Sequence, residues 1–103
     1  MTELEMIKAF AELEGVKVEL VSFDGVVCYV YGLDEIYNPL LPNTLNCAAR
    51  DKYKAMPHYR RKRVMTVGGE STGYKLFDAY YNHEDNIPKA VIECILKSQG
   101  LWK

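Results

Sequence analysis

Long apolar runs and paired cysteines are both missing from this sequence of 103 residues. No uncharged stretch reaches the roughly 18 residues that a membrane-spanning helix needs, and the N-terminus MTELEMIKAF lacks the basic-then-apolar order of a targeting signal. Cys28, Cys47 and Cys94 are odd in number and too widely spaced for a disulfide framework or a CxxC zinc site, so we expect free, buried thiols. These absences predict a soluble, cytoplasmic protein with no membrane partner.

Recognisable catalytic and metal-binding motifs are missing as well. The sequence contains no P-loop, no HExxH and no paired CxxC. GESTG at residues 69–73 matches GxSxG in its letters, but it lies in the loop of the predicted second hairpin and not at the strand-to-helix turn that this motif requires. His83 lies in the polar stretch NHED, which is typical of a surface loop, and whether it converges with His58 on a common site stays open. Gly68-Gly69 lacks the lysine and the following helix of a phosphate-binding loop. We therefore expect a protein that is not an enzyme and that holds no metal and no cofactor.

Local signals predict a helix, a hairpin, a second helix, a second hairpin and a third helix. Capping residues, turn residues and helix breakers mark the ends of these elements. They are a first helix between Thr2 and Gly15, strands 16–23 and 26–31, a helix 44–56 that Asn43 caps and Pro57 ends, strands near 58–67 and 73–81, and a last helix from Asn86 and Pro88 to Gly100.

The first hairpin carries apolar residues on both of its faces. Asp24-Gly25 predicts a two-residue turn, whose register places Leu20 and Tyr29 on one face and Cys28 on the other. A hairpin that is apolar on both faces is expected to be covered on both sides. We therefore predict an α+β fold in a single globular domain, residues 1–103. Its four-stranded antiparallel sheet would have helices on both faces, as an α/β/α sandwich.

Two stretches of the sequence resemble a known family. LPNTLNCAA at residues 41–49, and IPKAVIECILK at residues 87–97 running into Gly100-Leu101-Trp102, resemble the small bacteriophage and prophage proteins of the phage ABA sandwich family. The resemblance implies a phage accessory protein with a sheet between helical layers, and it brings no catalytic residues and no cofactor. It also implies core or core-rim positions for Leu45, Ala49, Val91, Ile95 and Trp102.

Charge is distributed unevenly along the chain. Residues 1–49 carry a net charge of −6, residues 50–63 one of +6 and residues 64–103 one of −1, within a total of −1. The centre of the basic segment is HYRRKR at residues 58–63, which lies outside the stretches that resemble the phage family. The near-neutral total therefore hides a strongly dipolar chain.

Two interpretations of the HYRRKR run stay open. Neither face of this strand would be apolar, so the run fits a sheet edge where charges discourage aggregation. The same cations also suit a binding patch, because arginine forks bind phosphates and carboxylates. With Lys52, up to seven cations could converge there. The candidate binding residues are Arg50, Lys54, Tyr59, Arg60, Arg61, Lys62 and Arg63.

The function expected from these features is that of a small, non-enzymatic bacteriophage accessory protein. It would bind a host or phage protein, including one whose defence or regulatory action it antagonises. One alternative is a module that binds or mimics nucleic acid through residues 58–63, although a sequence pI of about 6.1 disfavours a dedicated nucleic-acid binder. Another is a binder of a small anionic ligand such as a nucleotide. The oligomeric state stays open, a dimer included.

Overall fold

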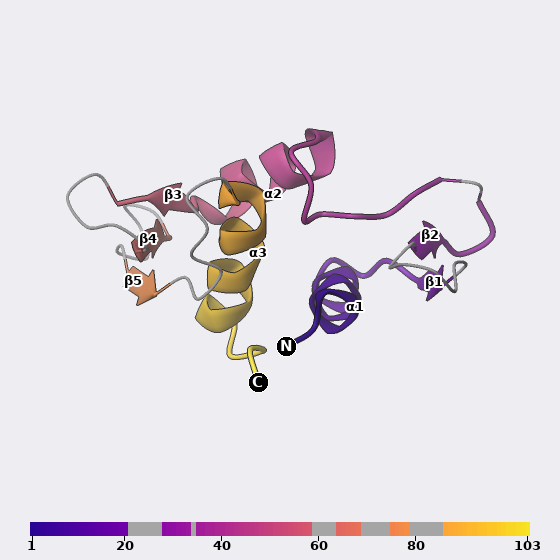
Figure 1. The fold of residues 1–103 in the computed structure, drawn as a ribbon, viewed down its shortest axis with the longest axis horizontal. Helices are drawn as coiled ribbons and strands as arrows, with labels where there is room; N and C mark the ends of the chain where they lie inside the picture. The colour runs from indigo at the N-terminus through magenta and orange to yellow at the C-terminus, as the bar shows by residue number, and fades with distance from the viewer. Residues whose placement is uncertain (21–27, 34, 59–63, 69–74, 79–85) are drawn as a thin grey trace.

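The computed structural model describes residues 1–20, 28–33, 35–58, 64–68, 75–78 and 86–103. In these parts of the chain, three helices lie between two small sheets at opposite ends of the molecule (Figure 1). The fold is α+β. Its elements are α1 (Glu3–Leu13), β1 (Val18–Leu20), β2 (Cys28–Val30), α2 (Thr44–Tyr53), β3 (Met56–Pro57), β4 (Val64–Val67), β5 (Lys75–Asp78) and α3 (Ile87–Ser98).

Helix α3 is the centre of the core. Seven consecutive residues, from Ala90 to Leu96, are at most 4% exposed, so the helix is buried around its whole circumference. Helices α1 and α2 pack against it, and so do strands β4 and β5 (Figure 1). From α1, the buried side chains of Met6, Ile7 and Phe10 contribute to this core. A helix that is apolar nearly all round has to be enclosed in this way to remain stable in water.

The predicted starts of the three helices are confirmed. At the start of α1 the Glu5 amide donates to the Thr2 hydroxyl, and the Thr2 amide donates to the Glu5 carboxylate. Asn43 caps α2, because its side-chain oxygen accepts from the Asn46 amide at 3.0 Å. Asn86 stands at the cap position of α3 but makes no capping hydrogen bond with its side chain. These signals lie within one helical turn, where a sequence pattern is most informative.

The predicted four-stranded sheet is wrong. β1 and β2 form one small sheet, while β3, β4 and β5 form a separate sheet in which β4 is the middle strand. β4 pairs on one side with β3, through Met56 opposite Thr66, and on the other side with β5. Both edges of β4 are therefore occupied, and the β1–β2 hairpin lies at the other end of the molecule, where it does not pair with the outer strands β3 and β5 (Figure 1). The element order also differs, since β3 takes up Met56, which the sequence placed in a helix over residues 44–56.

The register of the β1–β2 hairpin differs by one residue from the prediction. Leu20 lies opposite Cys28, whereas a two-residue turn at 24–25 requires Leu20 opposite Tyr29. The turn itself falls within residues 21–27, outside the described residues. A shift of one residue reassigns every side chain to the other face. The observed register places Cys28 on the same face as Leu20, and Tyr29 on the same face as Glu19. Cys28 is buried in the core, and the described part of the hairpin is covered on one face, not on both.

The three-stranded sheet is also covered on one face. Met65 and Phe77 form a cross-strand pair on the face towards α3, where the Phe77 carbonyl lies 3.8 Å from the Cys94 sulfur. On the opposite face, Met56 is 61% exposed and Leu76 is 49% exposed. In the described chain no helix covers this second face. The predicted sandwich, with helices on both faces of a sheet, is therefore replaced by an arrangement with helices in the middle.

Helix α2 ends at Tyr53, three residues before the predicted end, because Lys54 adopts a left-handed conformation with φ 53°. Left-handed backbone is unfavourable for any residue with a Cβ atom, and glycine avoids that cost. We expect Lys54→Gly to raise the free energy of unfolding by about 0.5–1 kcal/mol, measured by urea denaturation. The control is Ala48→Gly inside the same helix, which should lower it by about 1 kcal/mol. A loss of stability in both variants would contradict this account of the helix end.

Candidate functional site

The centre of the predicted basic site lies outside the described residues. This holds for Tyr59, Arg60, Arg61, Lys62 and Arg63. The two residues that flank them are close together, since the His58 amide donates to the Val64 carbonyl at 2.8 Å. The role of this run in binding therefore stays a prediction. His83 also falls outside the described residues.

The cations of α2 do not all point to one place. Arg50 and Lys54 are four residues apart and lie near the end of the helix, with Lys54 exposed. Lys52 instead contacts α1, where its ammonium lies 2.6 Å from the Glu14 carboxylate. This contact raises the pKa of Lys52, chiefly through the hydrogen bond to Glu14. Lys52 thus serves as an intramolecular bridge, and the predicted convergence of seven cations does not include it.

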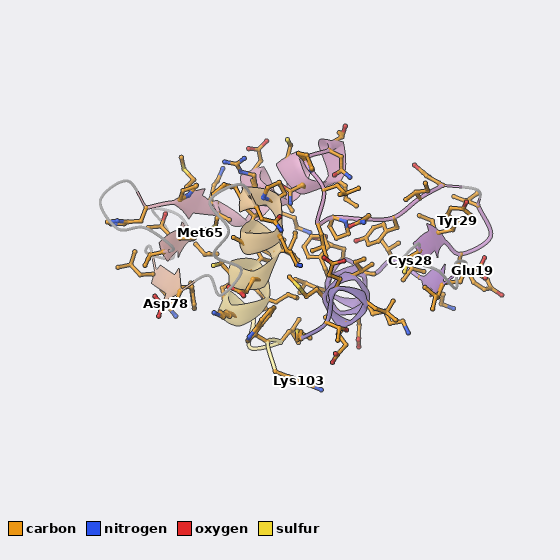
Figure 2. All side chains as sticks on the ribbon, viewed as in Figure 1. Glu19, Cys28, Tyr29, Met65, Asp78 and Lys103 are labelled. Atoms are coloured by element: carbon orange, nitrogen blue, oxygen red, sulfur yellow. The ribbon has the colours of Figure 1, made fainter. Side chains whose placement is uncertain are left out.

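A different surface lies at the end of the molecule opposite to β3, β4 and β5 (Figure 1). It is the side of the β1–β2 hairpin that points away from the core. Figure 2 shows Cys28 on the side towards the helices, with Tyr29 and Glu19 away from it. Tyr29 lies opposite Glu19 in β1 and is bridged on its other side by Ile36. The Tyr31 amide donates to the Lys17 carbonyl, which extends the same row. We call this surface the outer hairpin face: Lys17, Glu19, Tyr29, Tyr31 and Ile36.

The outer hairpin face exposes large apolar side chains. Tyr31 is 65% exposed and Ile36 is 62% exposed, and Leu33 in the adjoining turn is 56% exposed. Single exposed apolar residues are common, but a group on one sheet face is typical of an interaction surface. Tyrosine is favoured in interfaces because it combines a large apolar area with a polar hydroxyl. Lys17 and Glu19 add charges of both signs beside this apolar group.

Sequence reasoning missed this surface because of the register error. The two-residue turn placed Tyr29 and Tyr31 on a face together with Leu20, and both faces were expected to be covered by helices. The signal that could have found it is Glu19, a charged residue between Val18 and Leu20. In a strand with period-two alternation, a charge at that position marks a face in contact with water.

The described residues show no arrangement suited to metal or thiol chemistry. No group of three or more His, Cys, Asp or Glu side chains among them could hold a metal ion. Cys28 and Cys94 are buried, as predicted, whereas Cys47 is exposed. Burial raises the pKa of both buried thiols, that of Cys94 to about 12, so they stay protonated at neutral pH and are poor nucleophiles.

Comparison with known proteins gives no relative from which a function could be inferred. No family model, no curated protein and no solved structure matches it. None of the described helices is both long enough and apolar enough to cross a bilayer. The functional argument therefore depends on the surfaces of the molecule itself.

Proposed function

We propose that this is a non-enzymatic bacteriophage accessory protein that binds a host or phage protein in the host cytoplasm through its outer hairpin face. The observation that carries the proposal is the exposure of Tyr31 and Ile36 on a sheet face that no other described element covers. The resemblance of residues 41–49 and 87–97 to phage proteins supports the phage setting. A host defence or regulatory factor is one class of partner that such a protein would antagonise.

The chemistry of this face suits a protein partner better than a polyanion. Removal of apolar area from water is favourable by about 25 cal/mol per Å² before the entropic costs of association are counted, and the ring of Tyr31 and the branched chain of Ile36 provide such area. Glu19 and Lys17 lie in the same face and offset each other's charge, so the face has no net positive charge to attract phosphates. For nucleic acid or an anionic ligand, the basic run at residues 58–63 is the candidate. Lys52 would add little there, since it is bound to Glu14.

A matched pair of double variants tests this proposal. Tyr31→Ser with Ile36→Ser removes apolar side chains from the outer hairpin face, and we expect it to weaken partner binding by about tenfold or more. Met56→Ser with Leu76→Ser makes a comparable change on the exposed face of the sheet at the other end of the molecule (Figure 1). That control should leave the same binding within about twofold, because its face is remote from the proposed interface.

The measurement is affinity capture from host lysate, followed by titration of the captured partner by calorimetry. Thermal melts of both variants check that folding is retained, since exposed substitutions usually change stability by about 0.5 kcal/mol or less. Equal retention of the partner by both variants would refute the outer hairpin face as the interface. Loss of the partner in the control alone would assign binding to the opposite sheet.

A further inference from the structure

Strand β1 forms one edge of the small sheet that it makes with β2. The far side of β2 is occupied, because the Val30 amide donates to the Glu35 carbonyl at 2.8 Å and the Tyr37 amide donates to the Cys28 carbonyl at 2.7 Å. No described strand pairs with the outer side of β1, which lies at one end of the molecule (Figure 1). A strand edge of this kind accepts a further strand through backbone hydrogen bonds.

The hydrogen-bonding direction of β1 determines which backbone groups its outer edge offers. The Tyr31 amide donates to the Lys17 carbonyl at 2.8 Å, so the backbone of Lys17 points towards β2. Because this direction alternates along an antiparallel strand, the backbone of Glu19 also points towards β2, whereas the N–H and C=O groups of Val18 and Leu20 point outwards. The edge therefore offers the backbone of Val18 and Leu20 to an incoming strand.

The charged side chains beside Val18 are complementary to those of a second copy of the same strand. Lys17 and Glu19 are both exposed, lie on one side of the strand and have no ion-pair partner among the described residues. If a second β1 lies antiparallel with Val18 opposite Val18, Lys17 of each copy lies opposite Glu19 of the other. Opposite charges in such cross-strand positions are stabilising, whereas a register centred on Lys17 or on Glu19 would place like charges opposite each other.

We propose that the outer edge of β1 binds a second copy of this chain, as an antiparallel β1–β1 pair centred on Val18. The two-fold axis passes beside Val18, whose amide and carbonyl form two hydrogen bonds with the same residue of the second copy. Leu20, which is 49% exposed, lies opposite Val16 of the second copy and is thereby shielded from water. The Leu20 amide donates to that Val16 carbonyl, with no return bond, since the Val16 amide already donates to the Ala11 carbonyl.

This pairing does not rest on the proposed function, because it is measured on the purified chain alone. We expect sedimentation equilibrium in about 50 mM salt, where charge pairs are weakly screened, to show a reversible monomer–dimer equilibrium at protein concentrations up to about 1 mM. Lys17→Glu and Glu19→Lys each place like charges opposite one another at two symmetric positions. Each should therefore raise the Kd of the dimer about tenfold or more.

A mixture of the two single variants is the decisive sample. Lys17→Glu and Glu19→Lys chains should form a mixed dimer with a Kd within about threefold of the wild-type value, because every charge pair across the two strands again joins a lysine and a glutamate. Lys75→Glu is the matched control. It makes the same change in net charge at an exposed position of β5, at the other end of the molecule, and should leave the Kd within about twofold (Figure 1).

Amide hydrogen exchange locates the pairing on the strand. The Val18 amide points away from β2, so it should exchange rapidly in dilute protein and about tenfold or more slowly at concentrations where the dimer predominates. The Glu19 amide points towards β2 and is the internal control, since its protection within the hairpin should not depend on protein concentration. Thermal melts of the charge variants check that each one remains folded.

Four results would overturn the proposal. The first is an absence of self-association of the wild-type protein up to about 1 mM. The second is a dimer that Lys17→Glu or Glu19→Lys leaves intact or strengthens, which would exclude the register centred on Val18. The third is a failure of the mixed variants to restore the dimer, and the fourth is a dimer in which exchange of the Val18 amide is not slowed.

Discussion

Replacement of Lys97 with methionine is expected to lower the free energy of unfolding at neutral pH by about 3–5 kcal/mol. Glu93 is fully buried in α3, and the Lys97 ammonium lies 3.5 Å from its carboxylate, one helical turn away. Lys97 also donates to the Asp78 carbonyl at the end of β5. Methionine keeps most of the side-chain volume but leaves the buried carboxylate without this cation, and the desolvation of a carboxylate is costly. Urea denaturation at pH 7 measures the effect.

Two further variants separate charge from packing in this result. Glu93→Leu combined with Lys97→Met removes both charges and should recover most of the loss, because apolar replacements of a buried pair are often neutral or stabilising. Lys89→Met breaks a pair with Glu3, whose side chain is 53% exposed, and should cost about 1 kcal/mol or less. If Lys97→Met were no more destabilising than Lys89→Met, the buried pair would not be a determinant of stability.

Replacement of Ile95 with alanine is expected to cost about 2–5 kcal/mol, because it leaves a cavity at a fully buried position of the central helix. Leu45→Ala should cost only about 1–2 kcal/mol, since Leu45 is half-buried and borders an existing cavity. The sequence had indicated core positions for both residues without separating them. Thermal and urea denaturation of the two variants compares them, and similar losses would contradict the difference in burial.

The sequence was informative where the determining contact is local. The capping of α1 depends on Thr2 and Glu5, which are three residues apart, and both the prediction and the structure place the helix start there. The glycine at position 15 adopts a positive φ just after α1, as a helix stop requires. By contrast, Lys54 takes the same type of conformation at the end of α2, and a lysine gives no such signal. The predicted end was therefore misplaced.

Strand pairing could not be predicted with the same success because no single local signal determines which segments pair or in what register. The pairing of β4, Val64–Val67, depends on which segments occupy its two edges. One of these segments is β3, Met56–Pro57, and a strand of two residues is too short to show an alternating pattern in the sequence. The predicted register of the β1–β2 hairpin followed from a turn to which the sequence pattern assigned two residues. An error of one residue at that point grouped Tyr29 and Tyr31 with Leu20 instead of Glu19, so both faces looked apolar and both were expected to be covered.

Prediction of the candidate sites was limited in a similar way, because it depends on contacts that form only when the chain is packed. Lys52 looked like one cation of a basic cluster, but its partner Glu14 lies 38 residues earlier in the chain and becomes its neighbour only through packing of α1 beside α2. The burial of Tyr37, which is 4% exposed, is likewise a property of the packed structure, since tyrosine side chains are both buried and exposed in proteins. Sequence spacing alone predicts neither feature.

The packing of α1 against α3 determines when during synthesis the core can form. Glu3 and Lys89, whose side chains meet at 2.7 Å, are 86 residues apart in the chain. Both sheets, by contrast, pair segments that are near one another in sequence and can form while the chain is still growing. A ribosome adds about 5–20 residues per second, so the apolar face of α1 must wait several seconds or more in contact with water before α3 is available. During that interval Met6 and Ile7 lack the cover of α3, and a chaperone that shields them should raise the yield of folded protein.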